Sequence, residues 1–175
     1  MATCMNRAIE DGLIELLVEH VARRASAADL VDWATAALVA GEDTPALVIL
    51  AGLDRGTSVF EVAPWFDKAL SELNLAKVPE HELRRAFVGV VSRNLLDGRI
   101  NSDQALDRVH EHAVSPLGHP DDLMAWCFVW ERLGPGDHRS LSPAEVDAEA
   151  RRLAGEWAGR GGLPIEPGGV GGDDA

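Results

Sequence analysis

The chain has 175 residues, 46% of them hydrophobic and 26% charged, and its formal net charge at pH 7 is −13. This length and composition suit one globular domain with a core of its own, and no apolar stretch is long enough to cross a bilayer. The surplus of acids argues against direct binding to DNA, RNA or an anionic membrane, because such binding needs clustered lysine and arginine.

The N-terminal residues lack the basic and then apolar order of a signal peptide. The two cysteines, Cys4 and Cys127, do not make a disulfide framework. These features predict a protein of the reducing cytoplasm. Fourteen arginines against two lysines, with no tyrosine, suggest a GC-rich bacterial genome.

Apolar stripes at helical spacing alternate along the chain with signals for helix ends. Ser26 with Asp29, and Ser58 with Glu61, have the spacing of capping boxes, and Asn101 with Gln104 marks another helix start. The first six predicted helices cover residues 5–24, 26–41, 46–51, 58–73, 79–98 and 101–115.

A seventh helix is predicted over residues 119–133, with Pro120 in its first turn. Apolar residues lie on almost every side of this segment, so it must be covered on more than one face or form an interaction surface. An eighth helix is predicted to begin at Ser142-Pro143, with Glu145 in its first turn, and to continue to Trp157.

No segment shows the sustained alternation of a β-strand. We therefore expect an all-α protein, a single compact bundle of seven to eight helices. The helical domain is predicted to cover residues 1–158. A disordered, Gly-rich C-terminal tail is predicted over 159–175, where apolar groups are too few to offset the entropy of ordering.

Histidines near the end of the sixth helix raise the question of a metal site. His110 and His112 are two residues apart and point in nearly opposite directions on a helix, whereas chelating pairs lie four apart. His119 could meet only one of them, after the chain has folded back across a turn. The sequence thus predicts no metal site, and it contains no cofactor motif.

Other candidate residues have structural interpretations as well as functional ones. Asp122 sits beside Asp121 in a first helical turn, where acids are favoured by the helix dipole. Cys127 on an apolar helix is typical of a small core residue. Trp33 and Trp65 lie at the edges of apolar stripes, where tryptophans seal helix junctions or act as interface hot spots.

Three segments resemble a group of small, mostly uncharacterised all-helical bacterial proteins of immunity or accessory type. The similar stretches are Thr44 to Leu53, Phe60 to Leu73, and Leu96 through Ala105. The resemblance implies an all-helical fold. Because it is a packing pattern, it implies no site residue.

Two functions remain open, and a third alternative is self-association. The first is a non-enzymatic protein-binding module, immunity- or antitoxin-like or an adaptor, whose acidic surface holds a basic protein partner. The second is a small helical enzyme or ligand-binding protein, of the kind encoded in biosynthetic clusters, with a Trp-lined apolar pocket. The third is a homodimer formed through the Trp-rich helix. The candidate pocket or interface residues are Trp126, Trp130, Phe128, His110, His119, Asp122, Trp33 and Trp65.

A structural observation would separate the first two functions. A pocket of several hundred Å³ beside the histidines and Asp122 would favour the ligand-binding protein. A flat acidic face with exposed tryptophan would favour the protein-binding module.

Overall fold

A computed structural model describes residues 6–75, 78–132, 141–160 and 162–163. Across these residues the chain forms eight α helices and no strands, so the all-α prediction is confirmed. None of the described helices has the length and apolar character needed to span a bilayer. Contacts divide the chain into two compact units, residues 1–79 with 163–175, and residues 80–162.

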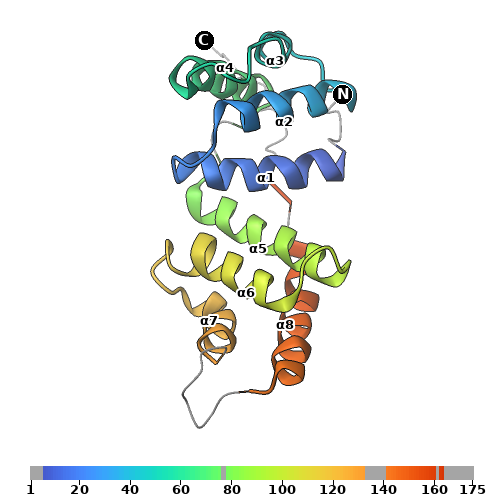
Figure 1. Ribbon diagram of the computed structural model, residues 1–175, viewed down its shortest axis with the longest axis vertical. Helices are drawn as coiled ribbons and strands as arrows, with labels where there is room; N and C mark the ends of the chain where they lie inside the picture. Colours follow the sequence, from blue (N-terminus) through green and yellow to red (C-terminus); the bar gives the residue numbers. More distant parts are fainter. Residues whose placement is uncertain (1–5, 76–77, 133–140, 161, 164–175) are drawn as a thin grey trace, which may run out of the picture. The chain divides into compact units, whose positions relative to one another are not determined.

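The first unit contains four helices, α1 (Arg7–Val21), α2 (Ala27–Val39), α3 (Pro45–Ala51) and α4 (Val59–Glu72). Helix α2 contacts each of the other three, and α3 also contacts α4 (Figure 1). Aromatic packing in this core joins α2 to α4, because the Trp33 ring meets Phe66 edge-on at 5.5 Å between centroids.

The second unit contains α5 (Glu80–Leu96), α6 (Ser102–Val109), α7 (Met124–Glu131) and α8 (Pro143–Trp157). Helix α5 contacts α6 and α8, and α6 also contacts α7 and α8 (Figure 1). The middle of α5 is buried on every side, because the seven consecutive residues from Ala86 to Ser92 are all buried. The second unit is therefore organised around α5 and α6.

Helix N-termini follow the predicted signatures closely. Complete capping boxes form at three of them, Ser26 with Asp29, Asn101 with Gln104, and Ser142 with Glu145. At α4 the prediction is wrong in detail. The Ser58 side chain accepts a hydrogen bond from the backbone N–H of Phe60, at 3.3 Å, instead of from that of Glu61.

The helix predicted over residues 119–133 is shorter than expected. A single 3-10 turn, Asp121–Leu123, precedes α7. Trp126 and Cys127 are each 1% exposed, whereas Phe128 is 53% exposed. Helix α7 contacts α6 and α8 but leaves one large apolar side chain, Phe128, on the surface.

Ordered contacts continue past residue 158, the predicted end of the helical domain. Residues Ala158–Arg160 form a 3-10 turn, and the Arg160 guanidinium lies over the Trp157 ring. Leu163 is buried and its backbone N–H donates to Glu10 at 2.9 Å. The rest of the predicted tail, residues 164–175, lies outside the described part of the chain.

Candidate functional site: a His-His-Cys cluster and an apolar groove

A π-helical turn follows α6 and determines where His110 points. Residues His110–Val114 form this turn, in which the Ser115 N–H donates to the His110 carbonyl at 2.9 Å. Arg84 of α5 is buried and donates to the His112 carbonyl at 2.5 Å. π turns inside helices are rare and are frequently found at functional sites.

The chain then reverses through two consecutive residues with positive φ. Gly118 has φ +69° and His119 has φ +59°. The His119 N–H donates to the Val114 carbonyl at 2.9 Å, which closes the turn on the end of the π segment. A positive φ is costly for a residue with a Cβ, although histidine tolerates it better than most. This reversal brings His119 back to His110, and their ring centroids are 6.1 Å apart.

Cys127 of α7 completes the cluster. One ligand atom each from His110, His119 and Cys127 lies within 4.8 Å of the others. His119 is exposed, His110 is half-buried and Cys127 is 1% exposed. The three side chains therefore form a cluster that is open to solvent at His119 and closed at the thiol.

Trp130 and Asp107 hold the His110 ring in place. The indole of Trp130 is stacked on the imidazole at 3.7 Å between centroids, with 4° between the ring planes. The Trp130 Nε1–H donates to the Asp107 carboxylate at 2.8 Å. The aromatic contact and the hydrogen bond together fix the plane that the His110 nitrogens share.

The Cys127 thiol is in a setting that keeps it protonated. Burial raises its pKa, and the Glu131 carboxylate, 3.7 Å from Sγ, raises it further. A nucleophilic cysteine needs the opposite, a cationic setting that stabilises the thiolate. The surroundings of Cys127 therefore do not favour nucleophilic catalysis.

Two other polar candidates have structural partners. His112 is buried, with its ring 5.3 Å from that of Phe87 on α5. Asp122 forms a two-point ion pair with Arg85 of α5, at 2.7 and 3.2 Å. These hydrogen bonds hold the pKa of Asp122 below its usual range. The structure brings His110 and His119 together, whereas the Asp122 carboxylate is paired with Arg85.

The tryptophan candidates have different settings. Trp33 is 7% exposed and Trp126 is 1% exposed, so both are core residues. Trp65 is half-buried on α4, with the Lys68 ammonium 5.4 Å from its ring centroid. The eight candidates thus do not converge on a single pocket in the described residues.

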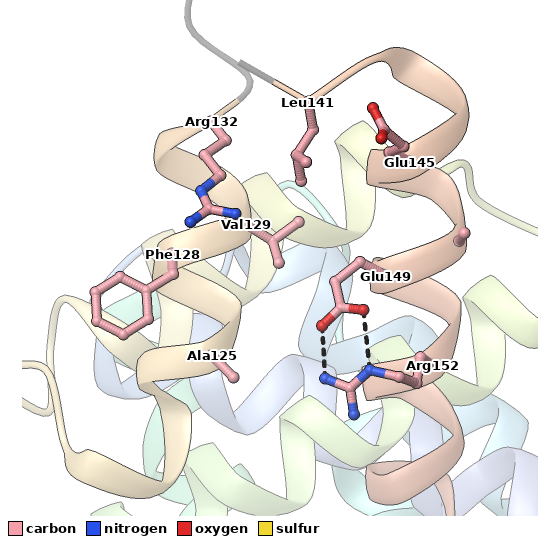
Figure 2. Close-up of a pocket in the computed structure, with 9 residues that line it drawn as sticks. Ala125, Phe128, Val129, Arg132, Leu141, Glu145, Glu149 and Arg152 are labelled. Atoms are coloured by element: carbon pink, nitrogen blue, oxygen red, sulfur yellow. Dashed lines mark hydrogen bonds and ion pairs between the residues drawn. The ribbon is translucent and has the colours of Figure 1, made fainter. Parts of the chain in front are cut away.

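A groove of about 630 Å³ lies between α7 and α8 (Figure 2). Phe128 and Val129 are among its α7 lining residues. In Figure 2 the Phe128 ring points outward from α7, away from α8, and Leu141 lies near one end of the groove. Phe128 is the only predicted pocket residue among the groove-lining residues that the structure describes. The groove therefore has the predicted size but not the predicted lining of tryptophan and histidine.

Charged side chains along the groove are largely paired. Figure 2 shows Glu149 holding Arg152 by two hydrogen bonds, at 2.6 and 2.9 Å. The hydrogen bonds from Arg152 hold the pKa of Glu149 below its usual range. Glu145 caps α8, and hydrogen bonds from Ser142 lower the pKa of its carboxyl. Both carboxylates on the α8 wall are therefore ionised at neutral pH.

Sequence reasoning placed His110 and His119 among the candidates but missed Cys127 as their neighbour. The available signal was the short distance along the chain between His119 and the start of α7. The prediction assumed regular helix geometry and so did not place these residues together. The π turn and the left-handed conformation of His119 change the directions in which the His110 and His119 rings point.

Comparison of the chain with protein families, curated proteins and solved structures finds no match.

Proposed function

We propose that this protein is a non-enzymatic binding module that receives an apolar segment of a basic protein partner in the α7–α8 groove. The observation that carries the proposal is Phe128, a large apolar side chain that is 53% exposed at the wall of a groove of about 630 Å³. Apolar anchors beside open grooves are typical of helix-in-groove recognition.

The charge of the chain supports a basic partner. Residues 1–79 carry twelve acids and six bases, and the whole chain has a net charge of −13. The groove itself is lined by Glu145 and Glu149 against Arg132 and Arg152, so its own charges balance. Long-range attraction would thus come from the whole chain, and the groove would supply the apolar contact.

If the module is immunity- or antitoxin-like, it would inhibit its partner by occluding the partner's site. The ligand-binding alternative has weaker support, because the polar groups expected at its pocket lie elsewhere. His110 and His119 do not line the groove, and Asp122 is engaged by Arg85.

Site-specific photo-crosslinking in a native lysate tests the proposal. A benzophenone amino acid replaces Phe128 in one variant. In the matched control it replaces Phe60, which is 86% exposed at the start of α4. We expect one basic protein to be crosslinked at Phe128 but not at Phe60, with a yield that falls as salt is raised.

Three outcomes would contradict the proposal. The first is no crosslinked protein at Phe128, and the second is equal capture at both positions. The third is a crosslink to a second copy of this chain, which would establish self-association. A small molecule found by native mass spectrometry, with no protein captured, would favour the ligand-binding alternative.

A further inference from the structure

We propose that His110, His119 and Cys127 form a binding site for a transition-metal ion, and that Zn²⁺ is the ion that best suits them. The site is distinct from the α7–α8 groove, because none of the three residues lines that groove. The inference therefore goes beyond the proposed binding of a protein partner and does not depend on it.

The donor atoms select the class of ion. Two imidazole nitrogens and one thiolate sulfur are borderline and soft ligands, which zinc and its neighbours in the first transition series prefer. Mg²⁺ and Ca²⁺ prefer carboxylate and carbonyl oxygens, and none of the three residues offers one in its side chain. The cluster thus matches zinc in the kind of ligand and provides three of the four ligands of a tetrahedral site.

The geometry needs only a small adjustment. Around a tetrahedral Zn²⁺ the ligand atoms are about 3.3–3.6 Å apart, given Zn–N and Zn–S bonds of about 2.0–2.1 and 2.3 Å. In the structure these atoms lie within 4.8 Å of one another. His119 is exposed, so rotation of its side chain can shorten its distances to His110 and Cys127.

The other two ligands are already positioned. The stacking of Trp130, which Asp107 anchors through the indole N–H, restricts the His110 ring. Cys127 is 1% exposed on α7, a helix that contacts α6, α8 and the π turn. Supports of this kind around metal ligands raise affinity, because less freedom is lost when the ion binds.

Binding proceeds with a simple proton balance. The Cys127 thiol releases its proton to solvent as the Zn–S bond forms, and each imidazole binds in its neutral form through one ring nitrogen. Three protein ligands leave the fourth position to a water molecule. The ion enters from the exposed His119 side.

Cobalt substitution in the full-length protein tests the site, because Co²⁺ takes zinc positions and a cobalt–thiolate bond gives a charge-transfer absorption. Cys4 lies outside the described residues, so the measurement uses a Cys4→Ser background that leaves Cys127 as the single thiol. We expect one Co²⁺ per chain with this absorption, and displacement of the cobalt by Zn²⁺.

Two variants test individual ligands, and a third serves as the control. Cys127→Ser removes the absorption. His119→Ala weakens Co²⁺ binding at least about tenfold, since loss of a supporting residue alone costs about 10–100-fold. The matched control is His81→Ala, an exposed histidine on α5 of the same unit, which should leave affinity unchanged. His119 is on the surface, so its variant remains informative even if Cys127→Ser does not fold.

The proposal is overturned if saturating Co²⁺ gives no charge-transfer absorption, because Cys127 is then only a buried core residue. It is equally overturned if His119→Ala and His81→Ala bind Co²⁺ alike. Zn²⁺ should also raise the melting temperature of the parent protein but not of the His119→Ala variant. Phe128 variants should bind cobalt normally, which separates this test from that of the groove.

Discussion

Replacing Trp126 with alanine tests whether α7 faces the core as the structure shows. Trp126 is 1% exposed, and removal of a buried tryptophan costs about 3–5 kcal/mol. Its indole nitrogen is buried, and no hydrogen-bond partner for it is found among the described residues. The variant removes this unpaired donor, which offsets part of the loss. We therefore expect a decrease of about 3 kcal/mol in the free energy of unfolding, at the lower end of the range.

Phe128, two residues further along the same helix, provides the matched control. Phe128 is 53% exposed, so Phe128→Ala removes about half of the burial energy of a phenylalanine and should cost about 1 kcal/mol. A third variant, Trp126→Phe, keeps most of the volume and deletes the unpaired N–H. Its stability should lie within about 1 kcal/mol of the parent.

Urea unfolding followed by far-ultraviolet circular dichroism measures all three variants. With a slope of about 2 kcal/mol per molar, Trp126→Ala should lower the midpoint by about 1.5 M, and Phe128→Ala by about 0.5 M. Equal costs for Trp126→Ala and Phe128→Ala would refute the orientation of α7. A Trp126→Ala midpoint equal to that of the parent would show that Trp126 is not a core residue.

Three further predictions concern single contacts. Ser26→Ala removes one half of a capping box and should cost about 1 kcal/mol in thermal or urea unfolding, whereas Ser26→Asp should restore most of it. Gly118→Ala meets no atom within 4 Å, so the φ of +69° alone should cost about 1–2 kcal/mol, and an unchanged melting temperature would contradict that backbone conformation. Asp122→Asn breaks the partly exposed pair with Arg85 and should cost at most about 1 kcal/mol at neutral pH. The pKa of Asp122 is lower in the folded state than in the unfolded state. The stability difference between the parent and Asp122→Asn should therefore be complete above the unfolded-state pKa, and it should disappear as the pH falls through the folded-state pKa. A difference that persists in acid would exclude the ion pair as its cause.

Local sequence signals predicted most of the secondary structure. Helix starts at Ser26, Asn101 and Ser142 were found because a capping side chain and its partner lie three residues apart, so the interaction needs no tertiary contact. The same reasoning misassigned the partner of Ser58. Its hydroxyl accepts from the N–H of Phe60, so two residues with the right spacing do not always form a box.

The candidate site depended on features that no local pattern contains. His110 and His119 meet because a π turn and a left-handed histidine redirect the chain between them. The buried Arg84 binds the carbonyl of His112, a residue 28 positions away. The Asp122 carboxylate accepts hydrogen bonds from Arg85, which is 37 positions away in the sequence. Spacing along an ideal helix cannot reveal any of these contacts.

The sequence by itself determined the helical class, the positions of most helix ends and the acidity of the protein. These properties follow from apolar periodicity, caps and charge, each of which acts over a few residues or over the whole chain. Only the tertiary structure decided which faces are covered. Trp126 and Phe128 are two residues apart on one apolar helix, yet one is core and the other is surface, because α6 and α8 cover α7 on some sides and leave Phe128 exposed.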